Sequence, residues 1–206
     1  MADIIDSGNA IQNKLMEDFK ELVSLINTQN KTELLSPLTI TLGDEFQGVT
    51  KGLSSTIKIM IALEERLIKE EKGFKLRYVI VHGEIDTPIN SQIAYGMLGE
   101  GLTQARNYLQ NIKKKSRRFF FSLSDKLKGE ALNDLFLVYQ NIIDGWNPNR
   151  DYDLASRFID NGYYKSIAFE MGKDRTLIWK RKKSLKIDEY NALKNLAYYL
   201  GGNQHE

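Results

Sequence analysis

The feature that most constrains the fold is a change of pattern near residue 145. Before it, segments with apolar residues three and four apart alternate with short runs of β-branched and aromatic residues, which are typical of helices and strands respectively. The segment DGWNPNR (144–150) then combines Gly, Pro and Asn, which marks a boundary. After this segment only short helical patterns follow. The sequence therefore predicts two modules, at residues 1–145 and 150–206.

The first module is predicted to be an α+β domain, because helices and strands alternate along it. Gly73 is expected to end the second helix and Ser124 to cap the fourth. Helices are expected over residues 10–27, 53–73, 102–115 and 124–145, and strands over residues 38–42, 46–50, 74–85 and 117–123.

Composition restricts the chemistry that the chain can perform. It has no cysteine and two histidines, His82 and His205, so a metal would be held by carboxylate and carbonyl oxygens, as Mg²⁺, Mn²⁺ and Ca²⁺ prefer. No apolar run approaches the roughly 20 residues needed to span a bilayer, and the first residues lack the pattern of a signal peptide. We therefore expect a cytoplasmic protein without a membrane partner.

The most specific local pattern lies in YYKSIAFEMGKDRTLIWKRKKS (163–184). Ala168 and Ile178 belong to the apolar positions of two short helices. Gly172 stands where a tight turn between them needs a residue that tolerates positive φ. Asp174 is placed to cap the second helix. The pattern predicts two packed helices joined by a short turn.

The same region is strongly basic. Residues 165–186 contain eight basic and two acidic residues, a net charge of +6, which favours an anionic partner. The region resembles a helix-turn-helix, in which the second helix enters the major groove of DNA. The resemblance implies that Arg175 and Thr176 read base edges. It also implies DNA contacts by Trp179, Lys180, Arg181, Lys182 and Lys183. The alternative is a solvated basic helix that supports the core. The helix expected over 187–200 is suited to packing or to pairing with a second copy, so a homodimer is also possible.

Two acidic segments lie in the first module, ADIIDSG (2–8) and TITLGDEFQG (39–48). The second reads as a hairpin with Gly43 and Asp44 at its turn. Turn preference alone accounts for acids at that position. The alternative is that Asp44 and Glu45 are metal ligands together with Asp3.

The order of elements over residues 2–125, together with VHGEI (81–85), resembles nucleotidyl cyclases and GGDEF-type diguanylate cyclases, which share a ferredoxin-like palm. The resemblance implies that Asp3 and Asp44, with Glu45, hold Mg²⁺ or Mn²⁺, which clamps a nucleotide triphosphate. The implied contacts to the nucleotide are Ile4, Asp6, Ser7, Gly43 and Arg106. The usual Asn and Arg of the cyclase helix are not matched, because Thr103 stands near the first position and Arg106 one residue before the second.

The whole chain resembles the SatD family through DIIDS (3–7), TITLGDEFQG (39–48) and the helix-turn-helix-like tail. This resemblance implies a bacterial protein. Three hypotheses follow for its function. The first is a DNA-binding transcription regulator with a sensor domain that binds a nucleotide or a metal. The second is a nucleotidyl cyclase or related phosphoryl-transfer enzyme. The third is a non-catalytic interaction module, so the sequence leaves open whether the protein is an enzyme.

Overall fold

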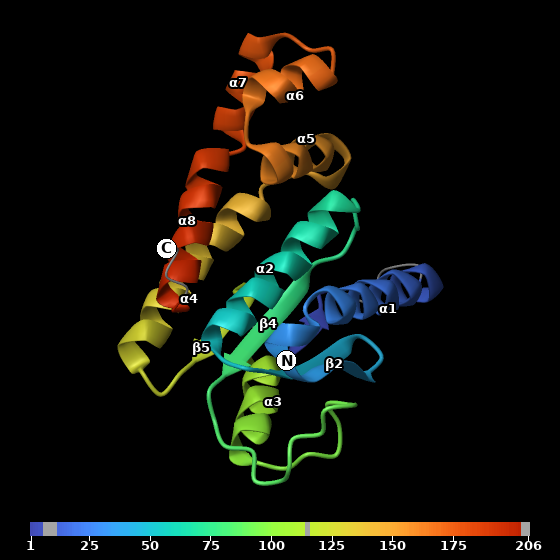
Figure 1. Ribbon diagram of the computed structural model, residues 1–206, viewed down its shortest axis with the longest axis vertical. Helices are drawn as coiled ribbons and strands as arrows, with labels where there is room; N and C mark the ends of the chain where they lie inside the picture. Colours follow the sequence, from blue (N-terminus) through green and yellow to red (C-terminus); the bar gives the residue numbers. More distant parts are fainter. Residues whose placement is uncertain (6–11, 114–115, 203–206) are drawn as a thin grey trace.

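The computed structural model describes residues 1–5, 12–113 and 116–202, and the fold is α+β with a five-stranded mixed sheet (Figure 1). The strands are β1 (Ala2–Ile4), β2 (Leu34–Leu42), β3 (Glu45–Thr50), β4 (Leu76–Val81) and β5 (Phe119–Ser122). The α-helices are α1 (Gln12–Gln29), α2 (Leu53–Lys69), α3 (Glu100–Ile112), α4 (Lys126–Ile143), α5 (Pro148–Asn161), α6 (Tyr164–Glu170), α7 (Arg175–Ser184) and α8 (Ile187–Leu200), with a short 3₁₀ turn, η2 (Lys31–Glu33). In these described parts of the chain, no helix has the length and apolarity that crossing a membrane requires.

The strands lie in the order β2-β3-β1-β4-β5. β1 is antiparallel to both of its neighbours, and Asp3 pairs with Glu45 on β3 and with Arg77 on β4. β2 and β3 form the hairpin that the sequence predicts. β4 and β5 are parallel, and α3 lies on the connection between them, as a parallel pair requires.

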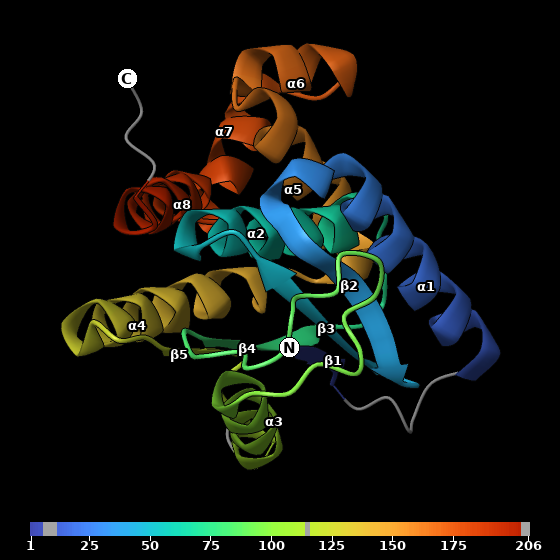
Figure 2. The ribbon, with the colours of Figure 1, turned by 60° about the horizontal axis from the view of Figure 1, so that its bottom comes forward.

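Alternation along the strands gives the sheet two different faces. Ala2 and Phe46 belong to the main hydrophobic core, with α1, α2 and α4. α3 packs on the opposite face, where Val79 belongs to a smaller apolar cluster (Figure 2). Asp3 and Arg77 each neighbour a core-facing residue in sequence, so their side chains point to the α3 face.

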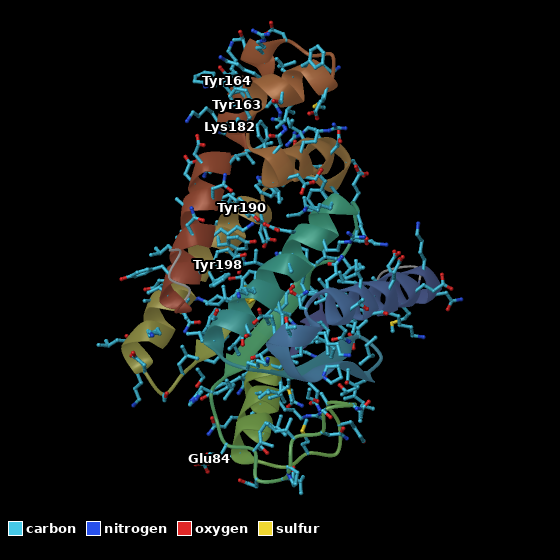
Figure 3. All side chains as sticks on the ribbon, in the orientation of Figure 1. Glu84, Tyr163, Tyr164, Lys182, Tyr190 and Tyr198 are labelled. Carbon is cyan, nitrogen blue, oxygen red and sulfur yellow. The ribbon has the colours of Figure 1, made fainter. Side chains whose placement is uncertain are left out.

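The C-terminal helices are attached to the first module through α5 and α8. α5 packs on α2, and α8 packs on both α4 and α2. Trp146 is buried at the junction and donates a hydrogen bond of 2.9 Å from Nε1 to the carbonyl of Leu185. Tyr190 of α8 points into the space between α8 and α2 (Figure 3) and donates to Glu65 at 2.8 Å. α6 and α7 form the tip of the molecule (Figure 1).

Most predicted elements are present, and the differences lie at their ends. The strand expected over 74–85 ends at Val81, because Gly83, two residues further on, packs closely against Gly101 at the start of α3. α4 is capped by Asp125 instead of Ser124, since the Asp125 carboxylate accepts a bond from the N–H of Lys128. α2 ends at Lys69, four residues before Gly73. Helix ends depend on such single hydrogen bonds, and sequence patterns locate them poorly.

Candidate functional site

The first candidate site surrounds Asp3 on the α3 face of the sheet. Asp3 lies in the middle of β1 and is 1% exposed. Its Oδ2 is 3.0 Å from Nη1 of Arg77 and 3.1 Å from Nζ of Lys113, at the end of α3. Burial raises the pKa of Asp3, while the charges of Arg77 and Lys113 act against that rise. Asp3 is therefore the buried centre of an ion-pair cluster.

Glu45 completes this cluster. It stands directly opposite Asp3 in the β1–β3 pairing, so the two carboxylates share a face of the sheet. Nζ of Lys113 lies 2.9 Å from Oε1 of Glu45, and one ammonium group thus contacts both carboxylates. Burial would lower the pKa of Lys113, but the bonds to Glu45 and Asp3 outweigh it and raise the pKa. Asp3 and Glu45 thus share the ammonium of Lys113, while Asp3 also binds Arg77.

The contacts of Asp3 and Glu45 limit how they could hold the predicted Mg²⁺ or Mn²⁺. Over residues 1–5, 12–113 and 116–202, no three or more acidic, His or Cys side chains are grouped so that they could hold a metal ion. Mg²⁺ requires about six oxygen ligands, of which Asp3 and Glu45 provide only a part. A divalent ion at this place would also compete with Lys113. The donors are chemically suitable but too few without oxygens from a bound ligand, and the metal site stays a prediction.

The hairpin turn between β2 and β3 lies beside the end of β1. Gly43 has φ of +50°, a conformation that glycine adopts without strain. The carbonyl oxygen of Asp44, the next residue, accepts a 3.0 Å bond from the N–H of Ile4. The strand end and the turn that carry the predicted ligands are therefore neighbours in space. Asp6 and Ser7, the other predicted nucleotide contacts near β1, lie outside the described residues.

The basic side chains at this site are not the one that the sequence predicts to bind phosphate. Arg106, the residue expected to bind phosphate, is exposed on α3. Arg77 and Lys113 contact Asp3 instead, and the sequence reasoning did not assign them. Arg77 carries a signal in retrospect, since it interrupts the apolar strand LRYVIV, and a buried charge needs a partner. Lys113 carries no comparable signal, because its contact depends on where α3 ends.

The second candidate site is the unit formed by α6, the turn after it and α7. Ala168 and Ile178 are buried between the helices. Gly172 in the turn has φ of +60°. The carboxylate of Asp174 accepts a 3.0 Å bond from a backbone N–H in the first turn of α7. The small residue, the turn glycine and the helix cap agree with the sequence prediction at each of these positions.

Between Arg175 and Lys180, α7 presents polar and aromatic side chains to solvent. Arg175, Thr176 and Lys180 are exposed, and Trp179 is 46% exposed. All four belong to the set that the helix-turn-helix resemblance assigns to DNA. They lie at the tip of the molecule, away from the sheet (Figure 1), so α7 is accessible to a large partner.

The last three cations of α7 are paired within the chain. Arg181 forms a salt bridge with Asp151 of α5, which is 1% exposed. Lys182 and Lys183 both contact Asp188 of α8, at 2.5 Å and 2.8 Å. These three cations, also predicted to bind DNA, therefore hold α7 against α5 and α8 in this structure.

The fold and the two sites define an α+β protein with an ion-pair cluster on its sheet and a basic helical tip. Residues 1–199 match the SatD family, and the chain belongs to that family. No curated protein and no solved structure matches the chain. The family membership confirms the SatD resemblance, while the likenesses to cyclases and to helix-turn-helix modules stay predictions.

Proposed function

We propose that this protein is a bacterial DNA-binding regulator in which α7 enters the major groove. The observation that carries the proposal is the α6-turn-α7 unit, with Ala168 and Ile178 buried and Gly172 at positive φ in the turn. In such units the N-terminal half of the second helix touches base edges. Arg175 and Thr176 occupy that half and are exposed.

The charges of α7 divide between DNA binding and support. Lys180 is exposed on α7 and would contact a phosphate, which adds affinity without sequence preference. Arg181 is bound to the buried Asp151, so its main role in the proposal is to orient α7. Lys182 and Lys183 share Asp188 and would reach DNA only by exchanging that partner for a phosphate.

The N-terminal part is proposed to be a sensor that binds a nucleotide or another phosphate ligand. The order β2-β3-β1-β4, antiparallel throughout, with α1 and α2 as crossovers on one face, supports a ferredoxin-like palm. Asp3 and Glu45 stand opposite each other on that sheet. Arg77 and Lys113 supply two cations at the same place, which suits a phosphate ligand.

Duplex DNA binding tests the proposal. A pool of random-sequence duplexes should bind with an affinity that falls steeply as salt concentration rises, because binding releases counterions. The double variant Arg175→Ala and Lys180→Ala should weaken binding about tenfold and lower the salt slope by roughly two. Fluorescence anisotropy over a series of salt concentrations measures both quantities.

A matched control uses lysines on another surface. Lys20 of α1 and Lys31 of η2 are exposed, and Lys20→Ala with Lys31→Ala removes the same charge far from α7. This control should leave the salt slope unchanged. Equal losses in the two double variants would point to general electrostatic attraction, and absence of binding at low salt would refute the regulator.

A second candidate function is metal-dependent phosphoryl transfer. It is favoured by the direct pairing of Asp3 with Glu45 and by the contact of the Asp44 turn with Ile4. Incubation with ATP or GTP and Mn²⁺ should then give a cyclic nucleotide or dinucleotide that is lost in Asp44→Asn. If the nucleotide raises the thermal stability but no product forms, the site is a sensor. If neither effect is observed, the remaining hypothesis is the non-catalytic interaction module.

A further inference from the structure

A cavity of about 260 Å³ lies where the C-terminal helices meet the first module. Its walls come from the end of α4, the start of α5 and the corner between α7 and α8 (Figure 1). The apolar side chains in these walls are Ile142, Trp146 and Leu185. An apolar cavity of about 150 Å³ in another protein is large enough to bind benzene, so this one has room for a ring and a further group. We call it the junction cavity.

The junction cavity has an excess of positive charge. Three cations, Arg150, Arg181 and Lys186, and one carboxylate, Asp151, line it, which gives a net charge of +2. Asp151 is 1% exposed and accepts bonds from both arginines, from Nε and Nη2 of Arg150 at 2.9 Å each and from Nη2 of Arg181. Arg181 also donates to Ser184 at 3.1 Å. A guanidinium has five N–H donors, so within the described residues each arginine keeps donors that these contacts do not use.

Lys186 has an unusual backbone conformation at the edge of this cavity. Its φ is +55° and its ψ is +41°, and it directly follows Leu185, the residue that ends α7. Many helices place glycine at this position, because a residue with a Cβ is strained there. The Lys186 side chain is exposed, and over residues 1–5, 12–113 and 116–202 it has no ion-pair partner. Backbone strain that a chain keeps in this way is found at functional sites, which favours a ligand for the Lys186 ammonium.

We propose that the junction cavity binds a small phosphate monoester. A phosphate monoester carries roughly two negative charges at neutral pH, which match the net charge of the lining. The two arginines, held in place by the buried Asp151, bind phosphate oxygens through their planar N–H groups, and Lys186 adds a third cation. The organic group of the ester lies against Trp146 and Leu185. This site is separate from the Asp3 cluster, and the proposal does not depend on whether α7 binds DNA.

Fluorescence of Trp146 tests the proposal, with phenyl phosphate as the probe. Trp179→Phe leaves Trp146 as the only tryptophan of the chain, and Trp146 lines the cavity. Phenyl phosphate should change the emission of Trp146 and saturate, with an affinity at least about tenfold higher than that of phenol or of inorganic phosphate, because each of these lacks one part of the ligand. Equal affinity for phenol or for inorganic phosphate would overturn the assignment of a phosphate ester, and so would the absence of any response to phenyl phosphate.

Lys186→Gly in the same background separates binding from stability. Glycine relieves the strained backbone, so Tm without ligand should rise by roughly 2 °C, while the affinity for phenyl phosphate should fall about tenfold because a cation is lost.

The matched control is Glu71→Gly. Glu71 has φ of +50° just after α2 and does not line the cavity. This variant should raise Tm by a similar amount and leave the affinity unchanged. Unchanged affinity in Lys186→Gly, as for binding at the Asp3 cluster, or an equal loss in both variants, would overturn the proposal.

Discussion

Asp151 links three parts of the C-terminal module through one carboxylate. It is 1% exposed at the start of α5. Oδ2 accepts a 2.9 Å bond from the N–H of Asn147, and Oδ1 contacts both Arg150 and Arg181. The bond from Arg150, helped by the N–H of Asn147 and the charge of Arg181, lowers the pKa of Asp151 to about 2. Asp151 thus fixes Asn147, the residue that caps α5, and holds α7 in place.

Asp151→Asn should destabilise the protein by about 1–3 kcal/mol at pH 7, because charged hydrogen bonds are lost. A lowered pKa means that the ionised form stabilises the fold above the ordinary value of 3.8 and that this contribution is lost as pH falls toward about 2. The difference in unfolding free energy between the wild type and Asp151→Asn should therefore vanish over that pH range. Urea unfolding at several pH values measures it.

The control for Asp151 is Asp153→Asn. Asp153 pairs with Arg157 on the surface of α5, and its side chain is 53% exposed. Such a pair contributes at most about 0.5 kcal/mol. A loss of similar size in both variants would mean that burial of Asp151 has no special role.

Lys113 is expected to exclude divalent cations from Asp3 and Glu45, because its ammonium contacts both carboxylates. Lys113→Met keeps most of the side-chain length and removes the charge. The variant should bind Mn²⁺ roughly tenfold more tightly, a difference of about 1.4 kcal/mol, seen as a larger rise of Tm with MnCl₂. Lys20→Met on α1 is the control, and an identical response of all three proteins would contradict competition at this site.

At the level of elements, the turn before α7 depends on backbone conformation. Gly172 has φ of +60° with open space around its Cα, whereas Gly73 also has open space but no positive φ. A side chain at positive φ costs about 1–2 kcal/mol. Gly172→Ala should lose about that much in urea unfolding. Gly73→Ala should be neutral or stabilising by up to about 1 kcal/mol, because alanine restricts the unfolded chain. Equal effects would show that the turn is not constrained.

Local chemistry explains which elements could be predicted from the sequence. The Gly43–Asp44 turn and the Asp174 cap depend on residues within a few positions, and both are present. The segment between β4 and α3 could not be predicted in the same way. It is held by the bond from Ser36 to the carbonyl of Asn90, 54 residues apart in sequence. The Lys113–Asp3 contact is of the same kind, since it joins two residues that lie far apart in the sequence.

At the level of the whole molecule, the two predicted modules share one hydrophobic core, which includes residues from α2, α4, α5 and α8. Polar contacts reinforce it. Arg118, just before β5, binds Glu64 of α2 at 2.5 Å and Asp144, the first residue of the boundary segment, at 2.6 Å. A buried cation that loses either partner would be costly. The packing therefore makes the stability of the C-terminal helices depend on the first module.

This shared core predicts a single cooperative unfolding transition. Trp179→Phe leaves Trp146, the only other tryptophan of the chain, as a reporter buried at the junction. Its fluorescence and the far-UV circular dichroism of the whole chain should follow one urea curve, because a two-state protein gives coincident transitions with different probes. In the same background, Tyr190→Phe removes the bond to Glu65 and should shift both curves together by about 1 kcal/mol. Modules with separate cores would instead give two transitions, and Tyr190→Phe would then move the fluorescence curve away from the circular dichroism curve.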